Sequence, residues 1–238
     1  MKKYITSLVV AFFALTAVAL SQTVAVTGTF EGEHVFRGQA TGKNVGGTEL
    51  TINLPSKTEL TVLGLWDVDT LKTNVLEVDV SFAQGFAIDK ATTFKVGGIG
   101  YFYPKASPTK GETNYTLELF GSLVYDTFLN PTVTAGYDLN LQQLFAEGTL
   151  SQPIELFFLA KGFKIVPSVA LGWSAAKDSL PEKRGPAVKD SYYYATGQVD
   201  FVYEVKNVVV GAGYRRNYLN NSITVNNDWF GGFLTVRF

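Results

Sequence analysis

Cysteine is absent from the 238 residues, and histidine and methionine occur once each. Without cysteine the chain has no disulfide, no thiol nucleophile, no thiolate metal site and no lipid-modified N-terminal cysteine. Charge is also scarce, because Asp, Glu, Lys and Arg make up 17% of the residues, against roughly 25% in soluble domains. A net charge of −1 leaves no electrostatic basis for binding nucleic acid.

The first 21 residues have the layout of a secretory signal peptide. Lys2 and Lys3 form a basic start, an uncharged and mostly apolar run covers 5–20, and small residues follow. We expect cleavage after Ser21, with a second possible site after Ala19. The alternative is an uncleaved anchor, but the run is at the short end of the ~20 residues that a membrane helix needs. We therefore expect a signal peptide at 1–21 and an exported domain at 22–238, which has no second long apolar run.

From Thr23 onward, apolar side chains recur mostly at every second position. In 74–86, for example, Val78 and Phe82 alternate with Glu77 and Asp79. This period of two indicates strands, and no comparable stretch has the helical period of 3.6. Alternation alone fits a soluble sandwich as well as a membrane barrel. The length of the segments, about ten residues or more, the aromatic residues near their ends and the export signal favour the barrel.

Twelve alternating segments can be counted. They cover 23–37, 47–54, 58–67, 74–86, 92–103, 113–124, 131–139, 144–157, 163–174, 190–204, 207–218 and 227–238. An even number suits a closed barrel with both termini in the periplasm, and the long connections, such as 39–46 and 175–189, should then face out of the cell. The fold class we expect is all-β: a closed antiparallel transmembrane β-barrel of about twelve strands in an up-and-down meander.

The last strand carries a candidate assembly signal. Phe238 is the terminal residue, and Phe230, Leu234 and Val236 share its face of the strand. A terminal aromatic on an alternating strand resembles the insertion signal that the barrel assembly machinery reads. We therefore expect this machinery to be a partner during insertion.

The residues on the opposite phase of each strand should face the interior, and the acids among them outnumber the bases. Glutamates and aspartates predicted to face inward are Glu31, Glu33, Glu49, Glu77, Asp79, Glu118, Asp138, Glu147, Glu155 and Asp200. The corresponding bases are Arg37, Lys95, Lys164, Arg215 and Arg237. One interpretation is a pore lined by these charges that prefers cations. The other is a set of inward salt bridges that pins the strands together and plugs the barrel, and the sequence leaves both open.

Short motifs in order along the chain resemble the TorF-type family of small outer-membrane porins. They lie at 36–38 (FRG), 46–50 (GGTEL), 64–69 (GLWDVD), 76–79 (LEVD), 96–104 (VGGIGYFYP) and 227–232 (NDWFGG). The chain departs from the family pattern at 41–44, where TGKN replaces an acidic segment. The resemblance implies an outer-membrane barrel of the porin class, and it implies no catalytic residues.

Enzyme and metal chemistry have little support. His34 is the only histidine, its phase predicts an outward position near the outer rim, and no serine stands in a nucleophile motif. Asp67, Asp69 and Asp228 are predicted in outer loops, where they would bind Ca²⁺ or bridge lipopolysaccharide, but their spacing is not that of a calcium loop. We expect no enzyme activity, no metal site and no cofactor.

The sequence therefore predicts a passive pore for small solutes in the bacterial outer membrane. Its expected partners are outer-membrane lipid, lipopolysaccharide and the diffusing solutes. The first alternative is a structural or adhesive barrel with a plugged lumen, and the 175–189 loop, rich in Lys, Pro and acids, is its second cue. The least favoured alternative is an outer-membrane hydrolase that uses His34.

Overall fold

The computed structural model describes residues 23–37, 39–69, 74–104, 114–176, 191–219 and 227–238. The predicted signal peptide at 1–21 lies outside the described residues, as does most of the 175–189 loop. Among the described residues, no helix is long and apolar enough to span a membrane.

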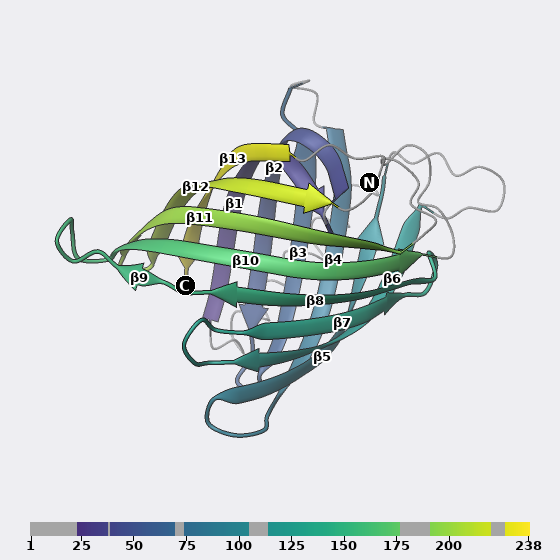
Figure 1. Ribbon diagram of the computed structural model, residues 1–238, viewed down its shortest axis with the longest axis horizontal. Coiled ribbons are helices and arrows are strands. Elements are labelled where there is room, and N and C mark those ends of the chain that lie inside the picture. The colour runs from purple at the N-terminus through teal and green to yellow at the C-terminus, as the bar shows by residue number, and fades with distance from the viewer. Residues whose placement is uncertain (1–22, 38, 70–73, 105–113, 177–190, 220–226) are drawn as a thin grey trace, which may run out of the picture.

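The described residues form thirteen strands (Figure 1). These are β1 (Thr23–Phe36), β2 (Gln39–Asn53), β3 (Thr58–Asp67), β4 (Asn74–Ala87), β5 (Thr92–Phe102), β6 (Tyr115–Tyr125), β7 (Thr132–Asp138), β8 (Gln143–Ser151), β9 (Ile154–Glu155), β10 (Phe163–Ala176), β11 (Tyr192–Val205), β12 (Val208–Leu219) and β13 (Asn227–Arg237).

Twelve of these strands close into one antiparallel ring. Each strand pairs with its neighbour in sequence, β1 pairs with β13, and β10 pairs with both β8 and β11. The two-residue strand β9 pairs only with β10, past the end of β8. Closure removes every sheet edge that would leave backbone groups unpaired in lipid. The predicted fold class, an up-and-down barrel of about twelve strands, is confirmed.

Two predicted boundaries are wrong. Residues 39–46, expected as a long outer connection, are the first half of β2 and pair with β1. The long alternating segment at 23–37 needs a partner along its whole length, and β2 supplies it, with Phe36 paired to Gln39 at the end of the hairpin. The segment expected at 144–157 ends at Ser151, because Gln152 and Pro153 interrupt the ladder before β9.

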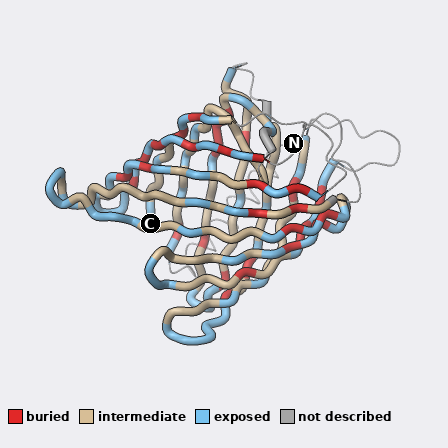
Figure 2. Tube along the Cα trace, in the orientation of Figure 1, coloured by how far each residue is buried: buried red, intermediate tan, exposed pale blue. Residues whose placement is uncertain are grey.

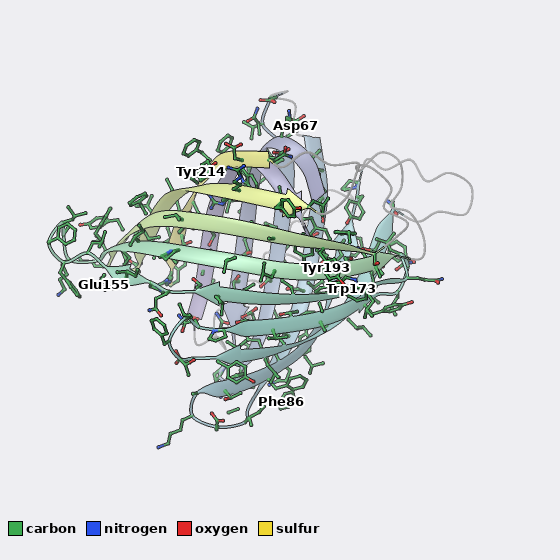
Figure 3. The ribbon with its side chains drawn as sticks, viewed as in Figure 1. Asp67, Phe86, Glu155, Trp173, Tyr193 and Tyr214 are labelled. Atoms are coloured by element: carbon green, nitrogen blue, oxygen red, sulfur yellow. The ribbon has the colours of Figure 1, made fainter. Side chains whose placement is uncertain are left out.

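The strands alternate between the two faces of the wall, as Figure 2 shows by the change of colour along each strand. On β12, for example, Val210 and Tyr214 are 46% and 38% exposed on the outside, whereas Val209 and Arg215 are 6% and 7% exposed inside. Trp173 and Tyr193 are paired partners on the outer surface, where Figure 3 places them beside each other. Large apolar and aromatic side chains therefore cover the outside, as expected for a surface in contact with lipid.

Four apolar residues that blur the sequence pattern face the interior. Leu63 and Leu65 on β3, and Ile99 and Tyr101 on β5, occupy the inward phase of their strands. Their partners on β4 include the acids Asp79 and Glu77, so apolar and acidic side chains alternate on this part of the inner wall.

The two ends of the barrel differ. We call the end near Thr23 and Arg237 the termini end and the end near Phe36 the loop end. At the termini end most connections are short turns, apart from the 152–162 connection that carries β9. In one of them the Asp89 carboxylate accepts the backbone N–H groups of Ala91 and Thr92 at 2.8 Å each, and these bonds lower the pKa of Asp89.

Candidate functional site

The tip of the β1–β2 hairpin reaches into the barrel at its loop end. Arg37 lies in the turn, with a left-handed φ of 47°, and its guanidinium forms an ion pair with Glu118 on β6. Its guanidinium carbon is also 3.6 Å from the centre of the Phe145 ring on β8. Neither β6 nor β8 is a neighbour of β1 in the ring, so these contacts cross the interior. Figure 1 shows the end of the hairpin curving away from the adjacent strands.

Apolar packing accompanies this ion pair. The Phe36 ring contacts the Tyr101 ring of β5 edge to face, with 5.7 Å between centroids. Tyr101 also interacts with Glu118. The hairpin tip is thus held against β5, β6 and β8 by aromatic contacts and one buried ion pair, which is expected to narrow the interior at the loop end.

His34 and Phe36 correct the predicted facing of the first strand. Both belong to the phase expected outside, yet His34 lines one interior cavity and Phe36 lines another. The pairing of β1 with β2 shifts register between His34 and Val35. A bulge of this kind twists and bends a strand, so simple alternation fails beyond it.

Two cavities flank the hairpin tip. The first, of about 350 Å³, is lined by Glu31, Glu33 and Glu147 together with Tyr194 and Trp229, and we call it the acidic cavity. The second, of about 390 Å³, is lined by Phe36, Tyr101, Phe120 and Phe145 beside Glu118, and we call it the aromatic cavity. Arg37 and Glu147 line both, so the cavities adjoin.

A cluster of charged side chains lies beside the acidic cavity, which Glu31 and Arg215 line. Arg215 on β12 lies 3.4 Å from Glu31 and 3.3 Å from Asp200. The Trp229 indole N–H donates to Glu31 at 2.7 Å, and the Gln198 amide donates to Asp200. Arg215 and Asp200 are almost fully buried, and the cost of burying them is offset because each charge has an opposite partner.

Two facing glycines make room for this cluster. Gly213 and Gly231 are paired across β12 and β13 on the inward phase. A Cβ at Gly231 would lie 2.5 Å from a Glu31 oxygen and 2.6 Å from an Arg215 nitrogen, and one at Gly213 would collide with Asp200. Only glycine allows these charged side chains to lie flat against the wall.

The remaining predicted bases are also paired. Lys95 lies 3.3 Å from Glu59, and Lys164 lies 3.2 Å from Glu155 and 3.0 Å from Glu204. Arg237 lies 2.7 Å from Glu204, at the termini end. Glu155 differs from its prediction, because it lies exposed in β9 past the end of β8 and not in the ring wall. Every base in the predicted inward set therefore has an acidic partner.

Several inward acids are not paired with a base in this way. Within the described part of the chain, Glu33, Glu49, Asp79, Asp138 and Glu147 form no ion pair. Neutral groups hold most of them: Asn227 donates to Glu33 at 2.9 Å, and the Tyr194 hydroxyl donates to Glu147 at 2.8 Å. Asp79 lies two residues from Glu77 on the same face of β4 and interacts with it. The acid excess expected from the sequence is present in the interior, while a role in lining a pore stays a prediction.

The predicted assembly signal lies on the outer face of β13. Phe230, Leu234 and Phe238 are 72%, 50% and 73% exposed, and Val236 shares their phase. Phe238 exchanges backbone hydrogen bonds with Val24 at 2.8 and 3.3 Å, so the last residue helps to close the ring. Recognition of this strand by the assembly machinery stays a prediction.

Sequence reasoning missed several interior residues. Glu204 shares the phase of Asp200 on β11, so the alternation already contained the signal for it. Glu59 was hidden because Leu63 and Leu65 obscure the phase of β3. No sequence signal placed Phe145 beneath Arg37, since that contact depends on the bend of a hairpin on the far side of the ring.

The predicted loop acids form no metal site. In the described residues no group of three or more His, Cys, Asp or Glu side chains could hold an ion. The Asp69 carboxylate instead accepts the Asn44 side-chain amide at 2.8 and 2.9 Å.

Solved structures with a similar fold are outer-membrane barrels. The NanC porin aligns with a TM-score of 0.56 and 13% identity, covering 90% of this chain and 98% of that one. An outer-membrane channel from Pseudomonas putida F1 aligns with a TM-score of 0.56 and 12% identity, covering 92% and 96%. The outer-membrane protein Omp33 of Acinetobacter baumannii aligns with a TM-score of 0.51 and 11% identity, covering 92% and 99%. No family model and no curated protein sequence matches the chain. At these identities the likeness establishes the fold.

Proposed function

We propose that the chain is an outer-membrane channel through which small solutes diffuse passively, with a preference for cations. The observation that carries this is the charge of the interior. All five bases of the predicted inward set are bound to acids, whereas Glu33 and Glu147 line the acidic cavity without forming an ion pair. A narrow passage with low-dielectric walls focuses the field of such charges and concentrates cations.

The barrel's setting is part of the same proposal. A cleaved signal peptide at 1–21 would export the chain, and the barrel assembly machinery would insert it through the Phe238 strand. Outer-membrane lipid and lipopolysaccharide would then surround the apolar outer face. Membership of the TorF-type porin family is supported by the motifs in the sequence, and the porin among the structural neighbours is compatible with it.

Conductance of the refolded mature chain in planar bilayers tests the channel. We expect discrete channel events whose conductance rises when Arg37→Gly removes the side chain that crosses the lumen. Lys90→Ala, in an exposed turn at the termini end, is the matched control and should leave conductance unchanged. An absence of channel events at any voltage, in wild type and in Arg37→Gly, contradicts the proposal.

A plugged structural barrel is the second candidate, and the hairpin tip is the observation that favours it. Phe36 and Arg37 pack against three wall strands across the lumen, as a plug would. In that case wild type would conduct nothing and Arg37→Gly would open the barrel. Conductance therefore separates the two candidates.

The hydrolase alternative has little geometric support. His34 lines the acidic cavity, but no serine among the described residues lines it. A serine, histidine and acid arrangement needs all three groups together. Unchanged lipase and protease assays on His34→Ala would remove this alternative.

A further inference from the structure

The most completely built feature of the interior is the place where the Arg37 guanidinium sits. One face of that guanidinium covers the Phe145 ring at 3.6 Å, and the Phe36 ring lies 4.5 Å from its carbon. Glu118 provides the opposite charge. The Arg37 side chain is 8% exposed and that of Glu118 is 2% exposed. A cation held by a ring face and a carboxylate away from water is strongly stabilised.

The wall residues of this site do not depend on the hairpin for their positions. Glu118 and Asp138 face each other across the β6–β7 pair, and both are almost fully buried. Asp138 is fixed because one of its oxygens accepts the backbone N–H groups of Asn140 and Leu141 at 2.9 and 2.8 Å. Tyr101, on β5, lines the aromatic cavity together with Glu118 and interacts with it. The ladder of the barrel therefore holds two carboxylates and a phenol around one spot.

A glycine sets the orientation of the aromatic ring. Gly136 lies on the inward phase of β7, opposite Phe145 on β8. A Cβ at Gly136 would collide with the Phe145 ring, so the ring lies flat against the backbone there. Its other face is thereby presented to the lumen, where Arg37 covers it.

We propose that Glu118, Phe145, Tyr101 and Asp138 form a binding site for solutes that carry a guanidinium group, and that Arg37 is its tethered occupant. The site belongs to the wall and the occupant belongs to the hairpin turn, so removing the Arg37 side chain leaves the wall residues of the site in the chain. The aromatic cavity of about 390 Å³ adjoins the site and is large enough for the rest of a small solute. A planar cation with several N–H donors matches a carboxylate beside a ring, as Arg37 itself demonstrates.

Because Arg37 is tethered beside the site, the concentration of guanidinium needed for binding should differ between wild type and a variant without Arg37. An intramolecular ligand has a high effective concentration, so an external guanidinium must compete with it in wild type. Arg37→Ala leaves the site empty and removes the competitor. The same solute should then bind at a concentration at least tenfold lower than in wild type.

The experiment measures thermal unfolding of the refolded mature chain in detergent micelles as ethylguanidinium is added at millimolar concentration. In Arg37→Ala we expect a saturable rise in the midpoint temperature, and in wild type a comparable rise only at tenfold or higher concentration. N-ethylurea, which has nearly the same shape and no charge, should produce no rise. The double variant Arg37→Ala with Glu118→Gln should lose the response, although its ring is intact.

Arg37→Lys is the second variant if Arg37→Ala does not refold, because it keeps a charge near Glu118 and vacates the planar site over Phe145. It should respond at a lower ethylguanidinium concentration than wild type does. No saturable rise in either single variant, or an equal rise in the Glu118→Gln double variant, would overturn the proposal. The readout is binding, so the result is independent of whether the barrel conducts ions.

Discussion

An arginine placed on the outer face of β11 should destabilise the barrel, whereas one at the adjacent inward position should not. Val199 is 37% exposed on the outside and pairs with Pro167 and Tyr214. Gln198 faces the acidic cavity and donates to Asp200. Val199→Arg and Gln198→Arg therefore add the same side chain one residue apart, to lipid in the first case and to water and acids in the second.

The depth of Val199 sets the expected magnitude. β11 runs from Tyr192 to Val205, so Val199 is near its middle. At roughly 3.3 Å per residue and a tilt of roughly 40°, Val199 is about 15–18 Å from each end of the strand, close to the centre of an apolar band about 25 Å tall. An arginine at the midplane costs ~2–4 kcal/mol. Gln198→Arg should change the free energy of unfolding by less than about 1 kcal/mol, because repulsion from Arg215, its partner on β12, is offset by Asp200 and by the acids that line the same cavity.

Urea unfolding of each variant in lipid vesicles, followed by tryptophan fluorescence, measures the difference. The three native tryptophans include Trp173 on the outer face and Trp229 inside, so the fluorescence reports on both faces of the wall. We expect the midpoint to fall for Val199→Arg with an unchanged slope. Equal stability of the two variants would refute the assignment of inside and outside on which the lumen description depends.

Three further predictions concern closure, packing and the hairpin. Deleting Phe238 removes its two backbone bonds to Val24, so the fraction of heat-modifiable barrel in the outer membrane should fall; a normal fraction would contradict the role of this strand in closure. Gly231→Ala should cost about 1–3 kcal/mol in urea unfolding, because its Cβ would displace the Glu31–Arg215 pair, whereas Gly28→Ala, with no atom within 4 Å of its Cβ, should cost much less. Arg37→Ala and Glu118→Gln should each lower the free energy of unfolding by about 3–5 kcal/mol, because either single change leaves a buried partner unsatisfied. The double variant should lose less than the sum of the two, and strictly additive losses would show that the two side chains are not coupled.

The ring itself was predictable from the sequence, because membrane strands must alternate. Segments such as 74–86 and 207–218 gave β4 and β12 almost to the residue, since lipid on one side and water on the other fix the phase of every side chain. Glu31, Asp200 and Arg215 were predicted to face inward for the same reason. Their meeting in one cluster was not predictable, because it depends on the register of three neighbouring strand pairs.

The hairpin tip was beyond prediction for a different physical reason. Residues 39–46 contain two glycines, four polar residues and Val45 as the largest apolar side chain, so they carry little strand signal of their own. They form β2 because β1 offers them a partner. The bulge at His34 then bends the pair inward, and no periodicity in a single segment encodes a contact between Arg37 and Phe145 across the lumen.

The reversal potential of refolded protein in a salt gradient tests the central claim most directly, because it reports both an open path and its charge. The account predicts a cation preference at 0.1 M salt that weakens at 1 M, since the Debye length falls from ~10 Å to ~3 Å. It also predicts a smaller preference when Glu33→Gln and Glu147→Gln neutralise two acids that line the acidic cavity and form no ion pair. An anion preference, or a cation preference unchanged by both substitutions, would contradict it.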